Sequence, residues 1–78
     1  MSISNEAVQA MILETFSDAE VTVSGDGYKY EATVISPAFA GLGKVKRHQM
    51  VYAAIKSAIT SGELHAMTIT ALTPEEAA

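Results

Sequence analysis

The stretch that decides the fold is residues 20–36, EVTVSGDGYKYEATVIS. Its first part alternates in hydropathy and predicts a strand over 20–24 with Val21 and Val23 on one side. Gly25-Asp26-Gly27 then supplies residues that tolerate a tight turn. In the second strand, expected over 28–36, one face carries Tyr28, Tyr30, Ala32 and Val34, and the other carries Lys29, Glu31 and Thr33. The stretch therefore predicts an antiparallel hairpin with one covered face and one partly wet face.

Helical patterns flank this hairpin. The first predicts a helix over 5–16, which Ser4 can cap and for which Ile3 and Val8 fit a hydrophobic staple. Its apolar stripe consists of Val8, Met11, Ile12 and Phe16. After Pro37, a short helical turn over 37–40 should be closed by Gly41.

A longer helix is expected over 44–61, and Gly62 occupies the place of a left-handed C-cap. Spacings of three and four give this helix an apolar stripe of Val45, His48, Tyr52, Ile55 and Ile59, which Val51 and Ala58 widen.

The third strand is expected over 64–72. One face should carry His65, Met67, Ile69 and Ala71, and the other Leu64, Ala66, Thr68 and Thr70. Its long helical connection to the second strand makes the two strands parallel. Thr73-Pro74-Glu75-Glu76 then begins a short helical stub. The prediction is one α+β domain over 1–78, a two-layer sandwich in the order α-β-β-α-α-β with a mixed three-stranded sheet.

Composition narrows the class of protein. The chain has 78 residues, no cysteine and 49% hydrophobic residues, which indicates a small globular domain without disulfides or thiolate chemistry. Its start has no signal-peptide pattern and no stretch reaches the length of a membrane span, so we expect a cytoplasmic protein without a membrane role. The net charge of −4 argues against non-specific DNA binding by the whole molecule.

His65 is the residue on which any functional interpretation depends, and two interpretations are open. It can be a structural hydrogen-bonding side chain, or it can be a metal ligand, since neutral imidazole is the commonest protein metal ligand. One histidine cannot hold a metal alone. The ligand interpretation therefore requires further ligands from a partner.

A basic segment precedes the longer helix's apolar stripe. Lys44, Lys46 and Arg47 stand at the helix start, where the dipole prefers anions, which hints at an anionic partner. The alternative is a solvated charged face. His48, in the same turns, is either a half-buried packing residue or part of that contact surface.

Enzyme and ligand motifs are missing from the sequence. Gly41-Leu42-Gly43-Lys44 lacks the spacing of a phosphate loop and of the GxxG clamp. Gly25-Asp26-Gly27 has one carboxylate, far too few for a calcium loop. Neither histidine has a nucleophile signature near it, so nothing argues for an enzyme.

Two motifs, in order, resemble the BolA family. Residues 35–52, ISPAFAGLGKVKRHQMVY, are similar to the family pattern VSxxFxGxxxVxRHxxVY. Residues 64–76, LHAMTITALTPEE, are similar to its HAxxI…TPxE ending. The short hairpin turn at Val23-Ser24-Gly25-Asp26-Gly27 is similar to that of the bacterial IbaG (YrbA) branch.

The resemblance implies a fold like a type II KH domain and a partner, a monothiol glutaredoxin. It implies a 2Fe-2S cluster bridged between the two proteins. Thiolates would come from the glutaredoxin and glutathione, and His65 would be the ligand from this chain. The implied role is a non-enzymatic adaptor in iron–sulfur trafficking or in iron and redox regulation, including stress response. Alone, the chain is expected to bind no cluster and to be a monomer or a weak homodimer.

The chain departs from the family in the hairpin loop. Many members carry a second histidine or cysteine there, whereas residues 24–30, SGDGYKY, contain neither. Asp26 or a residue outside the motif is the remaining source of a second ligand, and the shared cluster is expected to be more labile. The alternative function implied by the resemblance is a DNA-binding transcriptional regulator that uses Lys44, Lys46 and Arg47, with His48 beside them.

Overall fold

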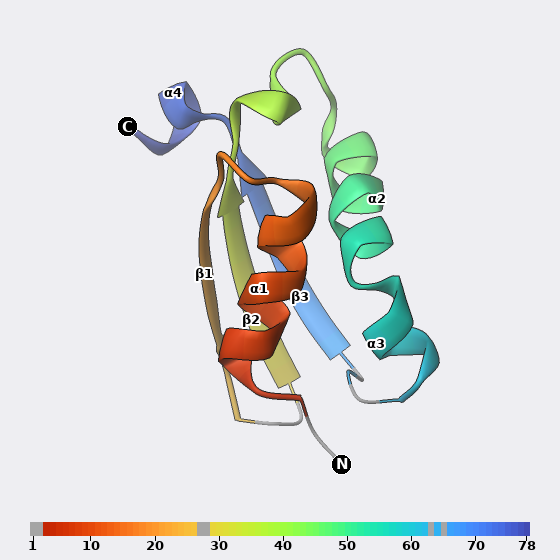
Figure 1. Cartoon of the computed structure of the whole chain (residues 1–78). Helices are drawn as coiled ribbons and strands as arrows, with labels where there is room; N and C mark the ends of the chain where they lie inside the picture. The colour runs from red at the N-terminus through yellow and green to blue at the C-terminus, as the bar shows by residue number, and fades with distance from the viewer. Residues whose placement is uncertain (1–2, 27–28, 63, 65) are drawn as a thin grey trace.

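The computed structural model describes residues 3–26, 29–62, 64 and 66–78 (Figure 1). The elements, in chain order, are α1 Asn5–Thr15, β1 Glu20–Gly25, β2 Lys29–Ile35, a 3-10 helix Pro37–Phe39, α2 Lys44–Ala54, α3 Lys56–Thr60, β3 Ala66–Leu72 and α4 Pro74–Ala77. The predicted α+β order is confirmed.

The sheet has the predicted mixed topology. Its strand order is β1-β2-β3, with β1 antiparallel to β2 and β2 parallel to β3. Val21 lies opposite Val34, and Ala32 lies opposite Ile69. Helix α1 packs on β1, α2 packs on β3, and the two helices contact each other, so the larger helices cover one face of the sheet (Figure 1). The likeness to a type II KH domain stays a prediction.

The core lies between the helices and the covered face of the sheet. Tyr30, Ala32 and Val34 are buried, as the alternation of the second strand predicts. From β3, Ile69 and Ala71 are buried, while Thr68 and Thr70 are exposed. The ring of Phe39, from the 3-10 helix, packs against Phe16 with 5.3 Å between ring centroids. The hydroxyl of the buried Tyr30 donates to the Ile3 carbonyl, which ties the N-terminal segment to the sheet.

The predicted helix ends are confirmed at several positions. The Ser4 hydroxyl accepts from the Ala7 N–H at 3.0 Å and caps α1. Thr73 and Glu76 form the predicted capping box of α4, with Pro74 in the first turn. Gly62 has φ +84°, the left-handed conformation that its position after α3 requires.

The single helix predicted over 44–61 is wrong, because it is broken at Ile55. This residue has φ −113° and ψ 13°, and its N–H donates to the Tyr52 carbonyl. Neither glycine nor proline occurs within 44–61, so the local sequence carries no sign of the break. Ile55 is fully buried, and the change of direction there accompanies its packing in the core.

The buried side of α2 also differs from the predicted stripe. Val51, Ile55 and Ala58 are buried, and the Arg47 side chain is 13% exposed. Val45, Tyr52 and Ile59 are instead exposed by 72%, 41% and 40%. The side of α2 that faces the core is thus displaced by about one residue from the predicted stripe. Arg47 lies on this inward side, where hydropathy alone predicts an apolar side chain.

The beginning of the third strand needs a smaller correction. β3 begins at Ala66, and Leu64 is buried rather than on the outward face with Thr68. The Leu64 N–H donates to the Ala58 carbonyl at 3.2 Å, so this residue belongs to the connection from α3. None of the helices in the described part of the chain has the length and apolar character needed to cross a bilayer.

Candidate functional site

His65, the predicted cluster ligand, lies outside the described residues. The chain on both sides of it is attached to the helices. Before it, the Leu64 N–H donates a hydrogen bond to the Ala58 carbonyl of α3. After it, the Tyr52 hydroxyl of α2 donates to the Met67 carbonyl of β3 at 3.4 Å. Leu64 and Met67, on either side of this position in the sequence, are therefore each hydrogen-bonded to one of the helices α3 and α2.

Asp26, the carboxylate in the hairpin, shapes the turn. Its Oδ1 accepts from the Lys29 N–H at 2.9 Å, and its own N–H donates to the Lys29 carbonyl at 3.3 Å. Gly25 is required beside it, because an added Cβ would lie 2.6 Å from the Lys29 carbonyl oxygen. Over residues 3–26, 29–62, 64 and 66–78, no group of three or more His, Cys, Asp or Glu side chains is placed to hold a metal ion.

The four residues predicted to contact a partner or nucleic acid do not share one environment. Lys44 and Lys46 are exposed at the start of α2, and His48 is half-buried. Gly43, the N-cap of α2, provides no side-chain hydrogen bond to the helix. Arg47 differs from these neighbours, because its head group is turned inward and engaged within the protein.

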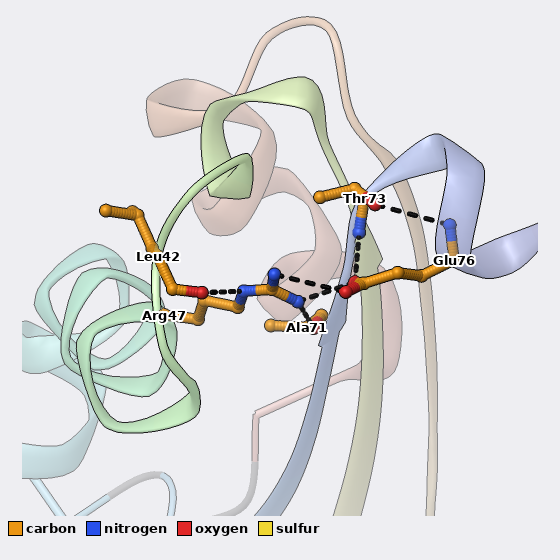
Figure 2. Close-up of polar contacts among 5 residues, drawn as sticks. All are labelled: Leu42, Arg47, Ala71, Thr73 and Glu76. Atoms are coloured by element: carbon orange, nitrogen blue, oxygen red, sulfur yellow. Dashed lines mark hydrogen bonds and ion pairs between the residues drawn. The ribbon is translucent and has the colours of Figure 1, made fainter.

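Arg47 joins three segments of the fold (Figure 2). Its Nε donates to the Leu42 carbonyl at 2.8 Å, and Nη1 donates to the Ala71 carbonyl at 3.0 Å. Nη1 and Nη2 also donate to the Glu76 carboxylate, at 2.6 and 3.3 Å. The head group therefore connects the loop before α2, the edge of β3 and the helix α4. We assign Arg47 a structural role, since these contacts occupy four of its five N–H donors.

Glu76 receives more than the capping box suggested. Its Oε1 accepts from the Thr73 N–H at 2.9 Å, which is one of the two capping-box bonds, and the Arg47 guanidinium adds two further hydrogen bonds to the carboxylate. The hydrogen bond from Arg47, followed by that from the Thr73 backbone, holds the pKa of the Glu76 carboxyl at about 2, below its usual 4.5. The sequence marks Glu76 as a capping residue, but it gives no sign of Arg47, 29 positions away.

A surface cleft of about 460 Å³ lies between α2 and β3. Because β3 is an edge strand, its outward carbonyls need partners. Arg47 and Tyr52, both from α2, supply hydrogen bonds to two of them. The cleft is lined by Leu42, Lys44, Arg47, His48, Glu76 and residues 69–72. It thus brings together three of the four predicted contact residues, Lys46 excepted, and adds a carboxylate.

Replacing Glu76 by glutamine should give a pH-dependent loss of stability. Because the folded-state pKa is depressed, the carboxylate stabilises the fold above about pH 4.5, and this contribution disappears as the pH falls toward 2. Thermal melts at several pH values should give wild type a higher Tm than Glu76→Gln at pH 7. This difference in Tm should disappear between pH 4.5 and 2. Glu75→Gln, on the exposed neighbour, is the control. A gap that stays constant down to pH 2 would contradict the Arg47–Glu76 assignment.

Comparisons with known proteins agree with this fold. Residues 4–76 match the family described as BolA-like protein. The chain is 42% identical over 74 residues to an uncharacterised protein from the rpoN-murA intergenic region of Acinetobacter guillouiae, covering 95% of this chain and 89% of that protein. It is 35% identical over 72 residues to the acid stress protein IbaG of Escherichia coli, covering 92% and 86%. A solved BolA homologue from Coxiella burnetii superposes with a TM-score of 0.85 at 32% identity, over 96% of each chain. The chain belongs to the BolA-like protein family.

Proposed function

We propose that this protein is a non-enzymatic adaptor that binds a monothiol glutaredoxin and shares a 2Fe-2S cluster with it, in iron–sulfur trafficking or iron and redox regulation. The observation that carries the proposal is the family match over residues 4–76, which includes the segment around His65. In this proposal His65 is the ligand from this chain, and thiolates of glutaredoxin and glutathione complete the site.

The donor set fits a shared cluster better than a resident one. The sequence has no cysteine, and the described residues gather no group of three possible ligands. A 2Fe-2S cluster needs four ligands, and the described residues bring no such set together. Imidazole ligation would raise the reduction potential of the cluster relative to thiolate ligation.

In this proposal the fold fixes the residues that flank the ligand in the sequence. The hydrogen bonds of Leu64 and Met67 attach the chain on either side of His65 to α3 and α2. Such anchoring lowers the entropy that a ligand loses when it coordinates. Since only the neutral imidazole binds metal, we expect mild acid to weaken cluster sharing.

The experiment is a titration of this chain into cluster-loaded monothiol glutaredoxin, followed by visible absorption and circular dichroism. The proposal expects a new spectrum that saturates at one chain per glutaredoxin, and native mass spectrometry should detect the heterodimer with two iron and two sulfide ions. A spectrum identical to that of glutaredoxin alone at every ratio would overturn it.

DNA binding by the basic segment is less well supported. Arg47, one of its expected phosphate contacts, is engaged with Leu42, Ala71 and Glu76. The Glu76 carboxylate also lines the same cleft and would repel phosphate. We therefore do not propose it as a second function.

A further inference from the structure

Charge is segregated along this chain. Residues 32–62 contain no aspartate or glutamate, although the protein has nine of them. Four of its five lysines and arginines lie in that same stretch, and α2 and α3 carry all four: Lys44, Lys46, Arg47 and Lys56. With Arg47 paired to Glu76, three lysines remain, all exposed, and no ion pair involves them in the part of the chain that is described. The α2–α3 pair is thus a cationic surface on an acidic protein.

The same two helices carry an apolar row. Val45 and Tyr52 are seven residues apart on α2, and Ile59 stands on α3, beyond the break at Ile55. Among the described residues these three are the large apolar side chains that stand exposed. We call them the outer row. Val45 stands between Lys44 and Lys46 in the sequence, and Lys56 lies between Tyr52 and Ile59. An exposed apolar row with a charged border is the composition of a protein interaction surface.

We propose that the outer row and its lysines form the docking surface for the glutaredoxin, and that docking does not require the cluster. This inference rests on the proposed function. Charge complementarity defines the opposing surface: apolar side chains bordered by carboxylates. A second copy of this chain is disfavoured as the occupant, because pairing the row with itself would bring lysines against lysines.

One member of the outer row, Tyr52, is hydrogen-bonded to a residue close in sequence to the candidate ligand. Tyr52 exposes its ring on the row while its hydroxyl donates to the Met67 carbonyl, two residues after His65 in the sequence. Figure 1 shows α3, which carries Ile59, beside the end at which β3 begins. The Leu64 N–H donates to Ala58, next to Ile59. A partner bound on the row would therefore lie against the start of β3, where cluster sharing would need it.

The test is calorimetric titration of cluster-free glutaredoxin into the full chain and into Val45→Glu. Val45 is 72% exposed and lies in the first turn of α2, where an acid is favourable, so the variant should keep its Tm. We expect its Kd to rise at least tenfold. Ala10→Glu places the same charge on an exposed position of α1 and should bind like wild type. Lys56→Glu should weaken binding and reduce its dependence on salt.

Two outcomes would overturn the inference. Equal affinity of Val45→Glu and wild type would remove the outer row from the interface, even if the cluster spectrum of the proposed function is obtained. A dimer of the chain alone in sedimentation runs, abolished by Val45→Glu, would assign the row to a second copy instead. If glutaredoxin binds neither with nor without cluster, the proposed function and the inference fall together.

Discussion

Replacing Arg47 by methionine should destabilise this protein by about 1.5–3 kcal/mol, the usual range for losing hydrogen bonds to a charged group. The substitution removes four hydrogen bonds and leaves the Leu42 and Ala71 carbonyls and the Glu76 carboxylate without their donor. Methionine keeps much of the apolar stem, so the loss reports mainly on the head group. Each kcal/mol lowers Tm by roughly 4–8 °C in a domain of this size, which makes the effect easy to measure.

Lys46→Met is the matched control for this change. It removes the same charge from the adjacent residue, whose side chain is exposed at the start of α2. Its Tm should stay within a degree or two of wild type, since surface substitutions usually change stability by less than about 0.5 kcal/mol. If Arg47→Met and wild type have the same Tm, Arg47 has no structural role and is available to contact a partner.

Replacing His65 by alanine should abolish the shared cluster with glutaredoxin. Alanine offers no ligand, and the cysteine-free chain has no thiolate to substitute. The mixture should give the absorption and circular dichroism of glutaredoxin alone, while cluster-free docking measured by calorimetry stays unchanged. His48→Ala, which removes the only other histidine, should retain the mixed spectrum.

His65→Cys separates the ligand from the residue's other contributions. A thiolate at this position should restore a bridged cluster, but with a lower reduction potential than the imidazole-ligated one. Potentiometric titration measures the difference. If His65→Cys has the potential of wild type, or if His65→Ala retains the mixed spectrum, the ligand is a different residue.

Hydropathy patterns predict most of this fold because each element has a local cause. The hairpin follows from alternation around Gly25, where the turn leaves no room for a side chain. The stub α4 follows from the Thr73–Glu76 capping box, whose two hydrogen bonds lie within one turn. The parallel pairing of β2 and β3 follows from the length of their connection.

The remaining features depend on contacts between distant residues. No glycine or proline marks the helix break at Ile55. The break coincides with the burial of the Ile55 side chain in the core. The inward position of Arg47 depends on Ala71 and Glu76, 24 and 29 positions away. A hydropathy pattern assigns arginine to the solvent-exposed side of the helix and therefore places Val45 and Tyr52 in the core. The predicted buried face of α2 is for this reason displaced by about one residue from the observed one.

The sequence likewise predicts some features of the candidate site and not others. The sequence singles out His65 as the possible ligand, because it is one of two histidines and stands in a family motif. It does not predict the hydrogen bonds of Leu64 and Met67 on either side, since both partners lie on the preceding helices. The exposure of the outer row is not predicted either, because the spacing of its residues also fits the buried stripe of a helix.

Pulsed electron paramagnetic resonance tests the central claim most directly. The chain would be labelled with ¹⁵N-histidine, mixed with unlabelled cluster-loaded glutaredoxin, and reduced. The account predicts a ¹⁵N hyperfine coupling of a size typical for imidazole bound to iron, present in His48→Ala and absent in His65→Ala. A reduced cluster in the complex that shows no such ¹⁵N coupling would contradict it.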